Sequence, residues 1–312
     1  MHNKKILVTG SNGLLGQKLV YKLKDRQDIH LIATSKGENR ILIKENYIYQ
    51  PLDITNQQEV ENVISTYLPD VIINTAAMTN VDACETQREL CRKLNVDAVA
   101  YLIDAIKKEQ SKNSSYNCHF IHLSTDFIFD GEAGPYDENA KPNPISFYGQ
   151  SKLDAETLVI NSGLKWAIVR TIIVYGIVDG MSRSNVVLWA REALQKGQKI
   201  NVVNDQFRTP TLAEDLADGC ILITDKGATG IYHISGKDYM SILEIVERVA
   251  DYFKLDKTLI NPVSSTSLNQ PAKRPPKTGF ILNKAINELG YNPHSFEEGL
   301  KILETQLKKH EN

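Results

Sequence analysis

Apolar runs typical of buried strands alternate with segments of helical period through the first half of the chain. The run in "KILVTG" is followed by "LLGQKLVYKLKD", where Leu15, Leu19 and Leu23 recur at helical spacing. Further apolar runs lie in "HLIATS", "DVIINTAA", "CHFIHLSTD" and "WAIVRTIIVYG", and helices are predicted for residues 56–68, 88–110 and 148–162. Strands that are apolar along their whole length and separated by helices indicate an α/β fold with a parallel sheet covered on both faces.

The alternation loosens after Gly176, and residues 264–279 form a proline-rich stretch without periodicity. We therefore expect a nucleotide-binding domain in residues 1–176, joined by a later segment near residues 205–236. The remainder of residues 177–312 is expected to form mainly a smaller C-terminal lobe that binds the substrate and closes over the strand ends. A chain of 312 residues is long enough for this arrangement.

Composition and charge exclude several classes of function. The net charge of −2 provides neither a basic footprint for nucleic acid nor a polybasic signal for a membrane. The N-terminus lacks the pattern of a signal peptide, and no segment approaches the length of a transmembrane helix. The four cysteines have no framework spacing and are expected to be reduced thiols. These features favour a soluble, cytoplasmic protein.

The motif "VTGSNGLLG" places Gly10, Gly13 and Gly16 where the first strand meets the first helix. Such a turn allows close approach of a pyrophosphate, to which the helix N-terminus offers free N–H groups and a positive dipole end. A well-packed turn would explain the glycines alone, but the strand before them and the helix after them favour a Rossmann-type, doubly wound sheet that binds a dinucleotide. The residues expected to contact the cofactor here are Gly10, Ser11, Asn12, Gly13, Leu14, Leu15 and Gly16.

The glycine spacing resembles that of the extended short-chain dehydrogenase/reductase family, and further motifs match this family in order. They are "LDIT", "NTAA", "KLNVDA", "STDFIFDG" and "YGQSK". The resemblance implies that Thr125, Tyr148 and Lys152 are catalytic. It also implies cofactor contacts at Asp53, Ile54, Thr75, Ala76, Ala77, Asn95, Tyr148 and Lys152.

The Tyr148 and Lys152 pair suits the interconversion of a carbonyl and an alcohol by a nicotinamide cofactor. A phenol with an ordinary pKa of about 10 is a poor acid near neutrality. A lysine one helical turn away lies on the same face and stabilises the phenolate, so that Tyr148 can act as general acid in reduction. About one accidental Tyr-x-x-x-Lys is expected in such a chain, and an aromatic residue packed under a loop is the alternative.

Within this family the chain is most similar to dTDP-4-dehydrorhamnose reductases. The matching segments include "NTAAMTNVDACE", "STDFIFDGEAGPYDE", "NDQFRTPTLAEDLA" and "KRPPKTGFILNK". The resemblance implies reduction of a nucleotide-linked 4-keto-6-deoxysugar by NAD(P)H, with dTDP-L-rhamnose as product. The residues that it places against the substrate are Thr79, Val81, Thr125, Asp126, Ile173, Arg183, Asn185, Arg208 and Arg274.

Three positions depart from this family's pattern. Ile173 stands where the family has a tryptophan against the sugar, and Arg208 stands where glycine is usual. We expect the Arg208 guanidinium to hold the diphosphate of the substrate bidentately. Lys18 stands where many members have a glutamate in a metal-linked dimer contact, which argues against that metal site and that dimer, although a homodimer stays open.

The end of the second strand predicts which cofactor is preferred. NAD-specific sites usually place a carboxylate there to hold both ribose hydroxyls. Here Thr34, Ser35 and Lys36 precede Glu38, and hydroxyls with a cation suit a 2′-phosphate better, with Arg40 as a second partner. Ser35 and Lys36 are therefore expected cofactor contacts, and NADPH is expected to be preferred over NADH.

Two alternatives complete the interpretation. A similar partial match is shared by the regulatory β subunit of methionine adenosyltransferase, so a non-catalytic NADP-binding subunit is the second hypothesis. His119 and His122 lie near Cys118, but alternate strand positions point to opposite faces and no second ligand cluster follows, so no metal site is expected.

Overall fold

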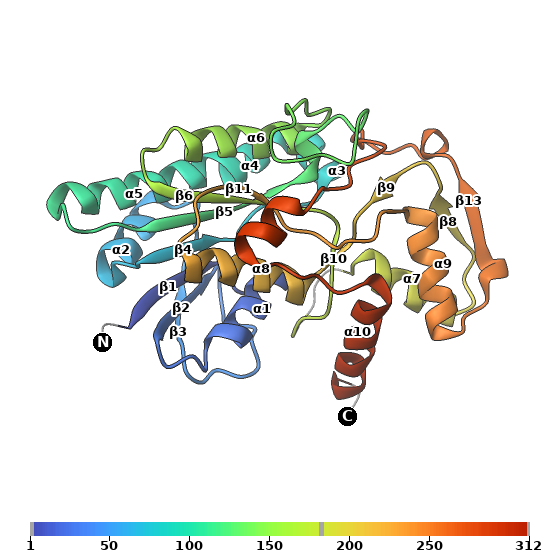
Figure 1. The fold of residues 1–312 in the computed structure, drawn as a ribbon, viewed down its shortest axis with the longest axis horizontal. Coiled ribbons are helices and arrows are strands. Elements are labelled where there is room, and N and C mark those ends of the chain that lie inside the picture. The colour runs from blue at the N-terminus through green and yellow to red at the C-terminus, as the bar shows by residue number, and fades with distance from the viewer. Residues whose placement is uncertain (1–2, 181–183, 311–312) are drawn as a thin grey trace.

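A seven-stranded parallel sheet forms the centre of the computed structural model, which describes residues 3–180 and 184–310 (Figure 1). Its strand order is β11-β6-β5-β4-β1-β2-β3, and the chain reverses direction across the sheet between β1 and β4. The strands are β1 (Lys4–Thr9), β2 (Ile29–Ser35), β3 (Ile48–Pro51), β4 (Val71–Asn74), β5 (His119–Thr125), β6 (Lys165–Thr171) and β11 (Gly230–His233). This order confirms the predicted doubly wound, Rossmann-type fold, although β3 has no counterpart among the predicted strands.

Helices cover both faces of the sheet, as Figure 1 shows. One face packs against α2 (Gln57–Tyr67), α5 (Ala98–Lys112) and α6 (Phe147–Ile160), and the other against α1 (Leu14–Leu23) and α8 (Ala213–Lys226). Side chains of a strand alternate between faces. In β1, Leu7 joins the cluster under α2 and α5, whereas Ile6 and Val8 join the cluster under α1 and α8.

Two predicted elements are interrupted in the structure. The predicted helix over residues 88–110 consists of α4 (Arg88–Arg92), a π-helical turn η1 (Lys93–Asp97) and α5. The predicted strand in residues 166–176 ends at Thr171 and resumes as β7 (Val174–Tyr175). Ile173 has a φ of +29° there, a conformation that β-branched residues rarely adopt, and this turn leads the chain out of the sheet.

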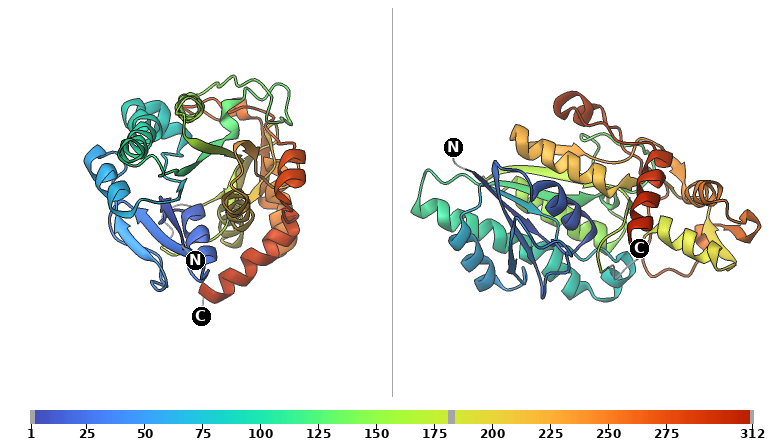
Figure 2. Two further views of the ribbon diagram at one scale, coloured as in Figure 1. Left: turned by 60° about the vertical axis from the view of Figure 1, so that its left-hand side comes forward. Right: turned by 90° about the horizontal axis from the view of Figure 1, so that it is seen from below.

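A smaller lobe follows the sheet and has a separate apolar core. It contains α7 (Val186–Gln195), β8 (Ile200–Val203), β9 (Phe207–Arg208), β10 (Thr211–Leu212), β12 (Met240–Ser241), α9 (Ile242–Phe253), η3 (Lys257–Leu259), β13 (Ile260–Val263), η4 (Ser265–Ser267) and α10 (Phe296–His310). The right view in Figure 2 shows α10, the red helix that ends at the C-terminus, between this lobe and the sheet layer. The chain returns to the large sheet through α8 and β11. Among the described residues, no helix has the length and apolar character needed to cross a membrane.

Candidate active site

The turn between β1 and α1 requires glycine at two of its three glycine positions. Gly10 has a φ of +65°, and a Cβ on it would lie 2.9 Å from backbone atoms of Ala76. A Cβ on Gly16 would lie 2.3 Å from the carbonyl oxygen of Gly10. The buried Ser11 hydroxyl has no hydrogen-bond partner within the described structure. A side-chain-free turn at a helix N-terminus with an unused hydroxyl fits the pyrophosphate of a dinucleotide.

Asn12 ties this turn to the segment that follows β2. Its amide nitrogen donates to the carbonyl oxygen of Glu38 at 2.8 Å, and its amide oxygen accepts from the backbone N–H of Arg40 at 2.9 Å. The segment after β2 is therefore held beside the glycine turn. This contact places the residues expected to recognise the adenosine ribose next to those expected to hold the pyrophosphate.

The carboxyl ends of β2 and β3 bring Lys36 and Asp53 together. The Lys36 ammonium lies 2.7 Å from the Asp53 carboxylate, which also accepts a hydrogen bond from the Thr55 hydroxyl at 2.7 Å. Burial alone would raise the pKa of Asp53, but these hydrogen bonds outweigh it and lower the pKa to about 2. Both predicted adenosine contacts therefore lie at one edge of the sheet, paired with each other.

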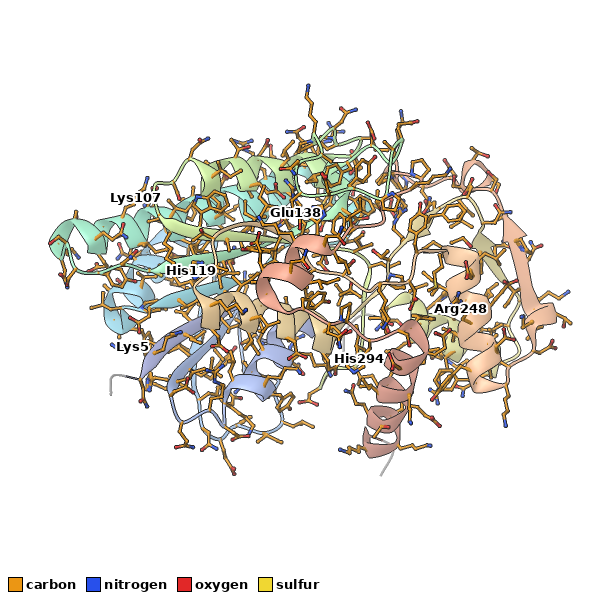
Figure 3. The ribbon with its side chains drawn as sticks, viewed as in Figure 1. Lys5, Lys107, His119, Glu138, Arg248 and His294 are labelled. Carbon is orange, nitrogen blue, oxygen red and sulfur yellow. The ribbon has the colours of Figure 1, made fainter. Side chains whose placement is uncertain are left out.

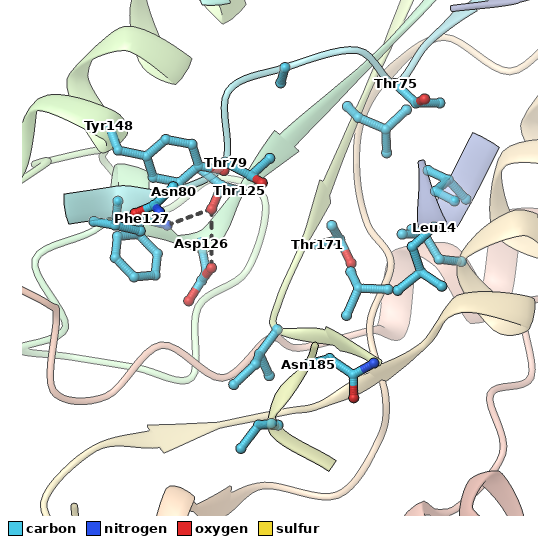
Figure 4. A pocket seen from close by; sticks show the side chains of 18 of the residues that line it. Leu14, Thr75, Thr79, Asn80, Thr125, Asp126, Phe127, Tyr148, Thr171 and Asn185 are labelled. Carbon is cyan, nitrogen blue, oxygen red and sulfur yellow. Dashed lines mark hydrogen bonds between the residues drawn. The ribbon is translucent and has the colours of Figure 1, made fainter. Parts of the chain in front are cut away.

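A cavity of about 760 Å³ opens at the carboxyl ends of the strands, and Thr125, Tyr148 and Lys152 all line it. Thr125 is the last residue of β5, whereas Tyr148 and Lys152 lie one turn apart on α6. Ser146 caps α6 by accepting from the N–H of Gly149 at 3.1 Å. The Tyr148 ring packs edge-on against Phe127 and lies beside Thr125 (Figure 4).

The electrostatics of these side chains are strongly shaped by burial. Burial raises the pKa of Tyr148, and a hydrogen bond with Thr125 acts in the opposite direction. Burial lowers the pKa of Lys152 to about 8, and its ammonium donates to the carbonyl oxygen of Leu123 at 2.6 Å. At neutral pH the Tyr148 phenol is thus protonated. The pKa of Lys152 lies close to physiological pH, so that its ammonium is close to losing its proton.

Asn95 holds the backbone on the other side of Tyr148. From the π-helical turn, its side chain accepts from the N–H of Met78 at 2.8 Å and donates to the Met78 carbonyl oxygen at 3.0 Å. It also donates to the Ser151 hydroxyl at 3.0 Å. Asn95 therefore links the loop after β4 to α6, although it does not line the cavity itself.

The cavity also collects most of the residues expected to contact the substrate. Those that line it are Thr79, Val81, Thr125, Asp126, Ile173, Asn185, Arg208 and Arg274, while Arg183 lies outside the described residues. The cofactor contacts that line it are Asn12, Leu14, Leu15, Thr75, Ala77, Tyr148 and Lys152. Further residues in the lining were not expected there: Asn80, Phe127, Gln206 and Leu216 lie within the matching segments quoted above, whereas Thr171 and Ile242 lie outside them.

The structure revises the expected role of Arg208. Its side chain is buried, and its guanidinium donates to the carbonyl oxygens of Phe207 at 2.7 Å and Pro275 at 2.8 Å. It also lies 3.6 Å from the buried carboxylate of Asp126. Most of its N–H groups are thus engaged by the chain itself, including one that donates to the Pro276 carbonyl oxygen at 3.2 Å. Arg208 joins β9 to the late proline-rich loop and is not the free cation expected to hold a diphosphate.

Arg274 lines the cavity and connects the late loop to α3 (Val81–Thr86). It donates two hydrogen bonds to Asp82, at 2.7 and 3.1 Å, and one to Gln270 at 2.9 Å. Its side chain remains partly exposed, unlike that of Arg208. Arg274 is therefore the more accessible of the two arginines that line the cavity among the described residues.

The histidines, cysteines and acidic residues of the described segments form no group of three placed to hold a metal ion. Lys18, at the position of the family's metal-linked glutamate, pairs with Glu214 of α8 at 2.8 Å. It is engaged within the chain.

Comparison with known proteins gives a consistent set of relatives. The model of the RmlD substrate binding domain family matches residues 4–308. The dTDP-4-dehydrorhamnose reductase of Aggregatibacter actinomycetemcomitans is 30% identical over 311 residues, covering 96% of this chain and 98% of that protein. Methionine adenosyltransferase 2 subunit beta of Xenopus laevis is 30% identical over 267 residues, covering 84% and 76%.

A solved structure extends the likeness to three dimensions. It is a dTDP-4-dehydrorhamnose reductase from Bacillus anthracis in complex with NADP. It is 28% identical, covers 98% of this chain and 100% of that chain, and superposes with a TM-score of 0.81.

Proposed function

The chain belongs to the RmlD substrate binding domain family of extended short-chain dehydrogenases/reductases, and we propose that it reduces the keto group of a nucleotide-linked 4-keto-6-deoxysugar with NADPH. The first candidate substrate is dTDP-4-dehydrorhamnose, which would yield dTDP-L-rhamnose. The observation that carries the proposal is that Thr125, Tyr148 and Lys152 share one cavity with the end of the glycine turn. A cofactor and a sugar can meet only in such a shared space.

The residues that would hold NADPH follow the carboxyl edge of the sheet. The glycine turn and Ser11 would receive the pyrophosphate, and Ser35 and Lys36 would receive the adenosine end. When bound, NADPH supplies the hydride. NADH is the alternative donor, and the NADP complex of the Bacillus anthracis reductase supports the choice of NADPH.

The chain's own residues would supply the proton and orient the keto oxygen. Thr125 and Tyr148 both present hydroxyl groups to the cavity, so they would hydrogen-bond the keto oxygen together. Tyr148 would then donate its proton to that oxygen as general acid. The charge of Lys152 would stabilise the resulting phenolate.

The sugar would lie against an aliphatic wall because Ile173 replaces an aromatic residue. Ile173 presents less surface for stacking on a sugar ring than tryptophan would. We therefore propose weaker discrimination among 4-keto sugars than a tryptophan-lined pocket would give. The diphosphate would be met by Arg274, whose side chain is more exposed than that of Arg208 and would exchange its contact with Asp82 for the phosphate.

NADPH consumption with matched sugars tests this proposal. We expect turnover with a dTDP-linked 4-keto-6-deoxysugar and far weaker turnover with the same sugar lacking its nucleotide. Equal efficiency with both would contradict a nucleotide-sugar site.

The relative from Xenopus laevis supports a second candidate function, a cofactor-binding regulatory subunit. Under this alternative, the chain would bind NADPH but would not oxidise it with any 4-keto sugar. Presence of the three catalytic side chains around one cavity favours the enzyme, since a regulatory subunit has no physical need for all three.

A further inference from the structure

A row of buried polar side chains crosses the centre of the sheet beneath the cavity. Thr9 of β1, Asn74 of β4 and His122 of β5 lie directly opposite one another in the strand register. The Thr9 hydroxyl donates to the Asn74 amide oxygen at 2.6 Å, and the Asn74 amide nitrogen lies 3.1 Å from Nδ1 of His122. Strands buried on both faces are normally apolar, so a polar row here is unusual.

The row ends at the catalytic lysine. Nε2 of His122 lies 3.3 Å from the Lys152 Nζ, and each of the four side chains is at most 3% exposed. Its other end is Thr9, directly before the glycine turn, and the Thr75 hydroxyl donates to the Thr9 carbonyl oxygen at 2.6 Å. The row thus connects the glycine turn with Lys152, the side chain proposed to stabilise the phenolate.

Hydrogen-bond chemistry permits two consistent proton arrangements in this row. With the Asn74 nitrogen facing the ring, Nδ1 accepts, Nε2 carries the proton, and the ring donates to a neutral Lys152 amine. With the Asn74 amide turned over, its oxygen accepts from Nδ1, so that Nε2 accepts from a charged Lys152. The tautomer of His122 is therefore linked to the charge of Lys152.

We propose that His122 is a positioning residue that holds the Lys152 ammonium in the catalytic site, and that Asn74 sets the ring tautomer that allows it to do so. A lysine ammonium has three N–H donors. In the arrangement with the Asn74 amide turned over, the Leu123 carbonyl oxygen and Nε2 of His122 accept from two of them, which leaves the third for the cavity that Lys152 lines. Without His122, the ammonium would lose a buried acceptor and its charged form would be destabilised.

The other charged or titratable groups near Lys152 do not replace this contact. On α6, the Glu156 carboxylate raises the pKa of Lys152, but it forms an ion pair with Arg170 of β6 at 2.7 Å. Tyr148 lies one turn away on the same helix, and Cys91 of α4 also favours the charge. Burial lowers the pKa of His122 itself well below its usual value, so the ring remains neutral and acts through its acceptor nitrogen.

The pH dependence of NADPH binding tests this inference, which rests on the proposed role of Lys152 in the cofactor site. NADPH fluorescence would be titrated for the wild type, His122→Phe and His122→Gln between pH 6 and about 10, a range that spans the lysine pKa. We expect the alkaline loss of affinity to move down by roughly one pH unit or more in His122→Phe, the effect of losing one hydrogen bond to a charged group. Glutamine offers an amide oxygen in place of Nε2 and is expected to restore most of the shift.

His119 provides a matched control because it is buried on the same strand. It lies at the opposite end of β5 from Thr125, away from the cavity (Figure 3). His119→Phe is expected to keep the wild-type pH dependence. A wild-type profile in His122→Phe, or equal profiles in the phenylalanine and glutamine variants, would overturn the inference.

A second variant serves if His122→Phe does not fold. Asn74→Ala keeps the ring but removes its Nδ1 partner, so the alkaline limb should move in the same direction by a smaller amount. If the alkaline loss of NADPH affinity in Asn74→Ala occurs at the same pH as in the wild type, the inference is overturned. NADPH binding without turnover of any sugar would contradict the proposed function alone, whereas absence of NADPH binding by the wild type would overturn both.

Discussion

Lys152 illustrates at the residue scale how a side chain proposed for catalysis can oppose stability. It is almost fully buried, and its pKa of about 8 is about 2.5 units below the ordinary value of 10.5. Each unit corresponds to about 1.4 kcal/mol, so protonated Lys152 costs roughly 3 kcal/mol of folding free energy below pH 8. This cost disappears as pH rises toward the unfolded-state pKa, because the unfolded chain then also loses the proton.

Lys152→Met isolates this contribution. The stability of the wild type relative to the variant should rise between pH 8 and about 10.4, by an amount on the order of 3 kcal/mol. Urea unfolding of both proteins across this range measures the difference, and the titrating groups that do not interact with Lys152 cancel. A difference that does not change with pH would show that Lys152 ionises normally.

Lys36 is the residue on which the expected cofactor preference depends. Its ammonium pairs with Asp53 in the structure but is largely exposed, so it can turn to a 2′-phosphate. Lys36→Ala should weaken NADPH binding several-fold and leave NADH binding almost unchanged. Calorimetry with both dinucleotides measures this, and equal losses for the two would contradict a contact with the 2′-phosphate.

At the scale of elements, α1, α8 and α10 are joined by a polar contact at Lys18. Its ammonium lies 2.8 Å from Glu214 of α8 and donates to Gln306 of α10 at 3.2 Å. Gln306 also donates to Glu214 at 2.6 Å. The ion pair is largely shielded from solvent, which distinguishes it from the Lys22–Asp218 pair between the same two helices.

Lys18→Ala should therefore lower the free energy of unfolding by about 1–2 kcal/mol, since it leaves Glu214 without its charged partner. Lys22→Ala is the matched control, with an expected loss under about 0.5 kcal/mol because its pair is exposed. Chemical denaturation measures both. Equal losses would mean that burial of the Lys18 pair contributes nothing.

The elements of the sheet could be predicted well from the sequence because their pattern is local. The apolar runs correspond to β1, β2, β4, β5 and β6, and the glycine turn lies between β1 and α1. The break at Ile173 carries no local signal, since isoleucine rarely adopts a positive φ. The burial of Arg208 depends on the carbonyl of Pro275, 67 residues further along the chain, which a local pattern does not report.

The candidate active site shows the same limit of local sequence patterns. The motifs bring Thr125, Tyr148 and Lys152 to one cavity, as the resemblance implied. From the sequence, His122 suggests only a metal ligand, because its contact with Asn74 requires the register of two strands that are distant in sequence. Sequence motifs therefore identify the side chains of the site better than the contacts that support them.

At the scale of the whole molecule, the late loop reaches from the smaller lobe to α3 of the nucleotide-binding part. The ion pair between Arg274, which lines the cavity, and Asp82 joins the two. If Arg274 also meets the substrate diphosphate, Arg274→Ala should raise the KM for the nucleotide-sugar by roughly tenfold with a smaller change in kcat. Asp82→Asn keeps the guanidinium and should leave the KM nearly unchanged. Equal increases in both variants would assign Arg274 to loop closure alone.

Transfer of deuterium from NADPH deuterated at C4 of its nicotinamide measures the proposed reaction most directly. NMR of the product, with a dTDP-linked 4-keto-6-deoxysugar as substrate, locates the label. We expect deuterium at C4 of the sugar with the wild type, and a rate at least about 10²-fold lower in Tyr148→Phe, which retains the fold and NADPH binding but lacks the proton donor. Absence of label at C4, or an equal rate in the phenylalanine variant, would contradict reduction by this site.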